Sequence, residues 1–199
     1  MPKKGKVSVD ALLAEGQDLI EREQYEEGLA KMRKAYQLAP SNVEVADTFG
    51  SALAETGHAE EAIQVLKHSV QLSPSVGFEK YMYLGQLLDG EPALNSARAG
   101  IKILRVEVQQ EPELKGPLAQ ALCSLSETLL NSQPVEVVGT ECEALLTEAM
   151  RTDPTSVEPM QGFASLRNEQ GRPEEALKAL KASLKRWLPP PPGGGGGWM

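Results

Sequence analysis

The chain has 199 residues, of which 41% are apolar and 24% charged, which is enough for one ordinary folded domain with a hydrophobic core. Its 20 Lys and Arg against 28 Asp and Glu give a net charge of −8, which argues against nucleic acid as a direct ligand and favours a basic partner. Two distant cysteines argue against a disulfide framework or a four-ligand zinc site, and the absence of any run of about 18 apolar residues argues against a membrane span.

A repeat of 34 residues is the first pattern met along the chain. Gly16 and Gly50 are 34 residues apart, and so are Pro40 and Pro74, which is the period of tetratricopeptide repeats. In such a repeat the Gly is followed at fixed offsets by a small residue, a large apolar residue and a Pro. The residues at these offsets are Gly28, Met32 and Pro40 in the first repeat, Ala62, Leu66 and Pro74 in the second, and Ala97 and Ile101 after Gly85 in the third.

The later repeats are less regular. Pro112 comes late in the third repeat, which predicts a lengthened second helix. In the fourth, we expect a helix over about 117–131, a polar and Val-rich connection over 132–138, and a second helix ending before Pro154. The fifth repeat has Ala176 and Leu180, and its turn at 171–176 resembles the turn at 57–62, where a Gly ends one helix before acidic residues open the next.

These spacings predict an all-α fold, a tetratricopeptide-repeat superhelical solenoid of about five helical hairpins over residues 8–188. An unrelated helical bundle is the alternative. Residues 1–7 are expected to form a flexible basic N-terminus. Residues 189–199 (PPPPGGGGGWM) form a low-complexity Pro/Gly tail, either a disordered extension or the product of a truncated or misassembled coding region.

Catalytic and metal-binding signatures are missing from the sequence. His58 falls in a predicted turn and His68 on an outward helix face, and neither has a ligand partner at helical spacing. Cys123 and Cys142 are expected to be buried thiols. We therefore expect no enzyme activity, no cofactor, no metal and no small-molecule substrate.

The first helix of each hairpin lines the concave face of this architecture, so its outward positions predict where a partner lies. Seven of the twelve positions are acidic and none is basic. Such a groove would hold a cationic segment and repel an acidic one, although ordinary solvated helix faces remain the alternative. The predicted positions are Asp10, Leu13, Gln17 and Glu21, then Glu44, Asp47, Ser51 and Glu55, then Glu79, Met82, Gln86 and Asp89.

Tyr81, Met82 and Tyr83 can add apolar contacts to this groove, with at least one of the two tyrosines expected in the core between helices.

One block of the sequence, Tyr81 to Leu87, is far more specific than the Gly and Pro spacing of the repeats. Further distinctive segments are 100–104, 121–125, 143–154, 171–176 and 187–189. Over roughly residues 7–189 the chain resembles one family, the fungal assembly chaperones dedicated to large-subunit ribosomal protein four.

The resemblance implies a chaperone that captures this ribosomal protein in the cytoplasm, shields its long basic internal loop and accompanies it to the nucleus. Family members are about twice as long, which implies that this chain is shortened after residue 189 and that its fifth hairpin lacks a cap. Lys3, Lys4 and Lys6 form either a weak nuclear import signal or a solvated tail. A generic tetratricopeptide scaffold and an unrecognised enzyme are the alternative functions.

Overall fold

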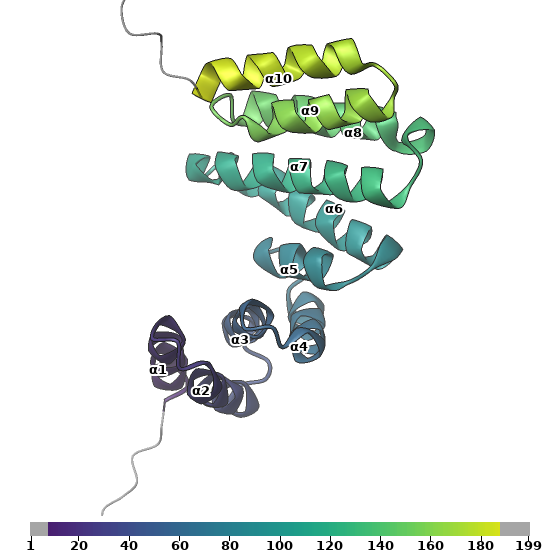
Figure 1. Cartoon of the computed structure of the whole chain (residues 1–199). Coiled ribbons are helices and arrows are strands. Elements are labelled where there is room, and N and C mark those ends of the chain that lie inside the picture. The colour runs from purple at the N-terminus through teal and green to yellow at the C-terminus, as the bar shows by residue number, and fades with distance from the viewer. Residues whose placement is uncertain (1–7, 188–199) are drawn as a thin grey trace, which may run out of the picture. The chain divides into compact units, whose positions relative to one another are not determined.

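The structure is a computed structural model that describes residues 8–187. Within this range the chain forms ten α-helices and one short 3-10 helix, without a strand. Contacts divide it into two compact units, one ending at Ile103 and the other beginning at Leu104, so that the division falls within α6 (Figure 1). The helices are α1 (Val9–Glu21), α2 (Tyr25–Leu38), α3 (Val43–Glu55), α4 (Ala59–Leu72), α5 (Glu79–Leu87), α6 (Gly90–Glu107), α7 (Lys115–Ser132), α8 (Val135–Thr152), α9 (Glu158–Glu169) and α10 (Pro173–Trp187), and the 3-10 helix spans Pro112–Leu114.

Successive helices pair as hairpins closed by tight turns. In the turn before α4, Gly57 has φ +83°, and in the turn before α10, Gly171 has φ +70°. Glycine is the residue that adopts this left-handed conformation without strain, so the two glycine turns predicted from the sequence are confirmed. The turn before α2 has the same geometry but holds Glu23, with φ +62°. The eighteen-residue α6 also confirms the lengthened second helix of the third hairpin.

Small residues allow the helices of the first unit to approach closely. A Cβ added to Gly16 would lie 2.7 Å from Met32 Cγ, and one added to Gly50 would lie 2.6 Å from Leu66 Cδ2. Both distances are too short for real atoms, so these repeat glycines are required by the packing of each hairpin. At Gly85 an added Cβ would meet Ala97 at an ordinary 3.5 Å, so the third repeat does not need its glycine for this reason.

The core of the first unit lies between the hairpins and includes Phe49, Leu53 and Leu66, each at most 1% exposed. Leu13, which the sequence register assigned to the outward face, is only 8% exposed and belongs to this core. That prediction was wrong because α1 packs against both α2 and α3. Its buried apolar face is therefore wider than contact with one neighbouring helix would require.

Two arginines on the second helices of hairpins pair with acids on the second helix of the next hairpin. In the first unit Arg33 of α2 makes a bidentate ion pair with Glu61 of α4, at 2.9 and 2.7 Å, which lowers the pKa of that carboxyl. In the second unit Arg105 pairs in the same way with Glu148 of α8. These cations therefore stabilise the stacking of neighbouring hairpins, because planar guanidinium groups bind carboxylates through two parallel hydrogen bonds.

The fourth hairpin, α7 and α8, differs from its predicted boundaries. Its connection is only Gln133 and Pro134, because α8 begins at Val135. The valines read as a connection instead start the helix, and Val138 is 3% exposed in the core. Pro117 lies inside the first turn of α7, where a missing backbone N–H costs no helical hydrogen bond.

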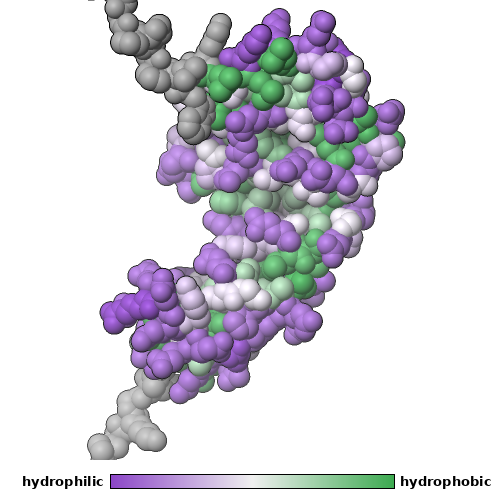
Figure 2. Space-filling model, viewed as in Figure 1, coloured by the Kyte–Doolittle hydropathy of each residue, from purple (hydrophilic) through white to green (hydrophobic). Residues whose placement is uncertain are grey.

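The last helix exposes an apolar stripe. Leu177, Leu180 and Leu184 of α10 are 51%, 42% and 56% exposed, and Figure 2 shows hydrophobic residues near this helix.

The N-terminal segment 1–7 and the Pro/Gly segment 189–199 lie outside the described residues. No helix in the described part of the chain is long and apolar enough to cross a membrane.

Candidate functional site

The first helices of the second and third hairpins, α3 and α5, lie side by side in the first unit. Asp47, Ser51 and Glu55 follow one another at intervals of four residues on α3, so they share one face of that helix. On α5, Glu79 and Tyr83 have the same spacing. We call these five residues the α3/α5 surface, and the contacts below show that the structure brings them together.

Tyr83 is the centre of the α3/α5 surface. Its hydroxyl donates a hydrogen bond to Glu55 Oε1, which joins α5 to α3. Partial burial, followed by this bond with Glu55 and the charge of Glu79, raises the pKa of Tyr83 to about 12, while Ser51 acts on it in the opposite direction. The phenol is therefore neutral at physiological pH and lies among two exposed carboxylates and a serine hydroxyl.

Asp47 belongs to an internal polar network at one end of this surface. It accepts a hydrogen bond from Ser69 of α4, and Lys80 Nζ lies 3.5 Å from its Oδ2. Lys80 is 1% exposed and also donates to Ser69 Oγ at 3.3 Å. The charged atoms of Asp47, Glu79 and Lys80 all lie within 4 Å of the position that a Cβ on Gly77 would occupy.

None of the twelve predicted positions is basic, but the structure places a cation, Lys80, next to them. Its ammonium group lies 3.5 Å from Asp47 Oδ2 and partly neutralises that carboxylate. Sequence reasoning missed it because a lysine is rarely fully buried. Glu79, the residue before it, is exposed, so its predicted position on the surface did not suggest that Lys80 is buried.

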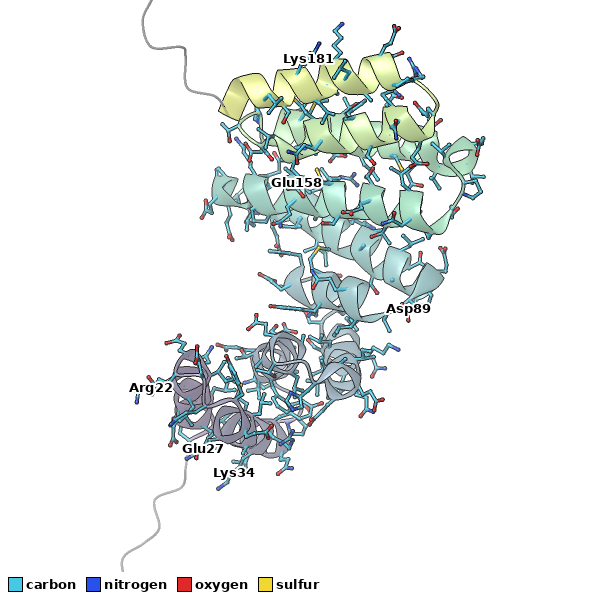
Figure 3. The ribbon with its side chains drawn as sticks, viewed as in Figure 1. Arg22, Glu27, Lys34, Asp89, Glu158 and Lys181 are labelled. Carbon is cyan, nitrogen blue, oxygen red and sulfur yellow. The ribbon has the colours of Figure 1, made fainter. Side chains whose placement is uncertain are left out.

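The remaining predicted positions divide into exposed and packed ones. Met82 packs against α6, since its Cε would collide with a Cβ on Gly100, so it is half-buried rather than open on the surface. Asp89 is exposed but lies beyond the end of α5, in its connection to α6 (Figure 3). Exposed side chains on their predicted helices are Asp10, Gln17 and Glu21 on α1, Glu44 on α3 and Gln86 on α5.

The aromatic residues next to this surface have different roles. Tyr81 is 7% exposed and donates a hydrogen bond to the Pro74 carbonyl at 2.8 Å, which confirms that one of the two tyrosines is in the core. His68, expected to be solvated, is half-buried, with Nδ1 2.6 Å from the Tyr36 hydroxyl. His58 is the residue just before α4 and makes no capping hydrogen bond with its side chain, whose Nε2 lies 3.8 Å from Glu26 Oε1.

The described residues contain no group of three or more His, Cys, Asp or Glu side chains placed to hold a metal ion. Both thiols are buried, Cys123 at 7% and Cys142 at 0% exposure, as the sequence predicted. The α3/α5 surface offers carboxylates and a neutral phenol, which can accept hydrogen bonds from cationic groups.

No family model matches the sequence. The chain is 29% identical over 186 residues to a Schizosaccharomyces pombe protein named "Probable assembly chaperone of rpl4", covering 88% of this chain and 55% of that protein. A protein of the same name from Emericella nidulans is 28% identical over 190 residues, covering 88% and 49%. The chain thus spans about half the length of the curated relatives that it matches.

Solved structures resemble the chain over most of its length. The structure titled "Assembly Chaperone of RpL4 (Acl4) (Residues 1-338)" superposes with a TM-score of 0.81 at 26% identity, covering 94% of this chain and 79% of that one. A MamA protein gives a TM-score of 0.69 at 18% identity over 89% of this chain and 91% of that one. YrrB, titled a TPR protein, gives 0.65 at 17% over 90% and 86%, and likenesses this remote show the fold alone. The chain has the all-α tetratricopeptide-repeat fold, and its predicted resemblance to the fungal assembly chaperones of rpl4 is confirmed.

Proposed function

We propose that this protein is an assembly chaperone for large-subunit ribosomal protein four, and that it holds a basic segment of that protein against the α3/α5 surface. The proposal is supported by the fungal relatives named for this role and by a similar solved structure with the same description. Their names and the repeat fold favour a binding function without catalysis.

The observation that carries the proposal is the pairing of Glu55 from α3 with Tyr83 from α5, beside Glu79. One carboxylate from α3 and one from α5 interact with the same phenol, so a Lys or Arg side chain placed there meets hydrogen-bond acceptors from both helices. The aromatic face adds attraction for a cation. Because Glu55 and Glu79 are exposed, the partner does not have to displace a buried ion pair.

The exposed acids on neighbouring positions extend this attraction. Asp10, Glu21, Glu44 and Asp89 are all exposed in the first unit, and Figure 2 shows hydrophilic residues over its α1 and α2 end. The negative potential of these acids speeds the encounter with a basic segment and makes the binding sensitive to salt. Asp47 contributes less, because Lys80 already neutralises part of its charge.

We further propose that these positions line a concave acidic groove, that the bound segment is the long basic internal loop of the ribosomal protein, and that the complex forms in the cytoplasm and reaches the nucleus. Shielding such a loop prevents it from aggregating or binding stray RNA before assembly. Under this proposal direct nucleic-acid binding, a membrane and a small-molecule substrate have no part in the function.

The proposal is tested by mixing the purified chain with purified ribosomal protein four, either complete or with its internal loop deleted. Light scattering during size-exclusion chromatography measures complex formation. We expect a complex with the complete protein and none with the loop-deleted protein. Equal binding of both forms, or of an unrelated basic protein of similar charge, would instead identify a generic tetratricopeptide scaffold.

A further inference from the structure

A pocket of about 370 Å³ lies between α7 and α9, the first helices of the fourth and fifth hairpins. Both helices belong to the second unit, where they contact each other as α3 and α5 do in the first. The twelve predicted partner-binding positions lie in the first three repeats, so none of the residues of this pocket is among them. We call it the α7/α9 pocket; its lining includes Cys123, Ser126, Glu127, Glu158, Gly162 and Ser165.

Ser126 gives the pocket an unused polar group. The residue is 2% exposed and lines the pocket, and within the described residues its hydroxyl has no hydrogen-bond partner. Other hydroxyls on α7, such as those of Thr128 and Ser132, bond to carbonyls of their own helix. Since no buried side-chain oxygen of the described residues lacks a partner, this hydroxyl is open to water through the pocket, and a ligand can take the place of that water.

Glu127 and Glu158 place two carboxylates at the same pocket, one from each helix. Both are exposed, and within the described part of the chain neither makes a side-chain ion pair. Figure 3 shows Glu158 between α7 and α9. Among the described residues that line the pocket, none is cationic.

Several small residues line the pocket. Gly162 lies on its wall, and a Cβ there would come within 2.6 Å of Leu146 Cδ2, so the packing of α9 on α8 excludes a larger residue. Ser165 is also small, and Cys123 forms part of the wall as a buried thiol. Burial, together with the nearby charge of Glu158, raises the pKa of Cys123 to about 12, so the thiol adds no negative charge at physiological pH.

We infer that the α7/α9 pocket binds one cationic side chain, Lys or Arg, of the bound polypeptide, with Glu127 and Glu158 contacting its charge and Ser126 accepting a hydrogen bond. The inference rests on the proposed function, because it takes the occupant from the same basic partner. It adds a second contact point, built from residues of a different unit. The two carboxylates and the hydroxyl supply acceptors for a group that has only donors to offer.

The first experiment locates the contact. Argininamide and lysinamide are titrated into the ¹⁵N-labelled full chain, and amide chemical shifts are recorded. We expect the largest shifts at residues 123–131 and 158–165, and smaller ones in the Ser126→Ala variant. Shifts elsewhere only, or shifts unchanged in Ser126→Ala and in E127Q/E158Q, would overturn the inference.

The second experiment measures affinity with a fluorescein-labelled peptide of alternating Arg, Lys and Gly. Since exposed ion pairs contribute modestly, E127Q/E158Q should weaken binding about fivefold. The control E136Q/E169Q removes the same charge from exposed glutamates outside the pocket and should change binding less than about twofold. Equal effects of the two double variants would contradict the inference.

The outcomes separate this inference from the proposed function. If E55Q/E79Q weakens peptide binding and E127Q/E158Q does not, the α7/α9 pocket is not a contact point while the proposed function stands. If the amides shift the pocket resonances but the chain binds no ribosomal protein four, the pocket is a cation site and the proposed function fails. Circular dichroism of each variant confirms that it is folded.

Discussion

Lys80 is a buried lysine beneath the α3/α5 surface. It is 1% exposed, lies 3.5 Å from Asp47 and donates to Ser69, so it links three helices of the first unit. A buried cation is stable only when paired, and removal of one partner leaves the other without compensation. The residue therefore supports the fold and at the same time reduces the negative charge available to a partner.

The substitution Lys80→Met separates these two effects. Loss of the ammonium group leaves Asp47 and Ser69 without their cationic partner, and because Asp47 is one-third exposed we expect the free energy of unfolding to fall by about 1–3 kcal/mol. Affinity for a basic peptide should rise. The exposed Lys67 of α4 provides the control, since Lys67→Met should change stability by less than about 0.5 kcal/mol. Urea unfolding that is the same for both variants would contradict a stabilising role for Lys80.

Cys123 allows a chemical test of burial in the second unit. Its pKa is raised to about 12 from an ordinary value near 9, and only the thiolate is alkylated. At pH 8 the thiolate fraction, and with it the rate of reaction with iodoacetamide, should be lower than in the urea-unfolded chain by about a thousandfold. Mass spectrometry of the peptide that contains Cys123 measures this rate, and rapid labelling of the folded chain at pH 8 would show that the thiol is not held as described.

At the scale of the elements, the close packing of helices within a hairpin depends on repeat glycines. Gly50 has no room for a Cβ beside Leu66, whereas a Cβ added to Gly85 of α5 would meet Ala97 at 3.5 Å, an ordinary contact distance. The same substitution is therefore expected to have opposite effects at the two sites.

Gly50→Ala should lower the free energy of unfolding by about 1–3 kcal/mol, because Leu66 must leave its packed position. Gly85→Ala should leave stability unchanged or raise it by up to about 1 kcal/mol, because Ala has the higher helix propensity and an added Cβ meets only ordinary contacts there. Thermal unfolding followed by circular dichroism measures both. A destabilised Gly85→Ala together with a neutral Gly50→Ala would contradict the packing described for the first unit.

The elements themselves could be predicted from sequence where a local rule applies. The 34-residue period located the hairpins, and the turn at Gly57 followed from a glycine placed before acidic residues. The fourth hairpin was misjudged because Val135 and its neighbours have a low helix propensity, which the core contact of Val138 overrides.

The candidate site was less predictable than the fold. Helical spacing correctly grouped Ser51 and Glu55, but the register alone cannot show that Leu13 is covered by two neighbouring helices or that Met82 turns towards α6. Hydrogen bonds such as that from Tyr83 to Glu55 join different helices, and one-dimensional spacing does not encode them. The α7/α9 pocket depends on such contacts as well.

At the scale of the molecule, the charged side chains of the described residues differ in whether they form ion pairs. Arg33 and Arg105 pair with acids on the second helices of hairpins, while Glu55 and Glu79 remain exposed on first helices. Unpaired acids on first helices favour a basic partner there, whereas the paired charges mainly stabilise stacking. Removing exposed acids from the first helices should therefore weaken partner binding, whereas removing exposed acids from the second helices should change it little.

The affinity of the chain for a fluorescein-labelled internal-loop segment of ribosomal protein four, measured by fluorescence anisotropy, tests this account most directly. The variant E55Q/E79Q should bind about fivefold more weakly than the wild type. The control E27Q/E60Q, which removes two exposed acids from the second helices α2 and α4 (Glu27 in Figure 3), should bind within about twofold of the wild type. The difference between the two variants should shrink as salt is raised from about 0.05 M to about 0.5 M. Equal affinities of the two variants at low salt would contradict the proposal that the α3/α5 surface binds the basic segment.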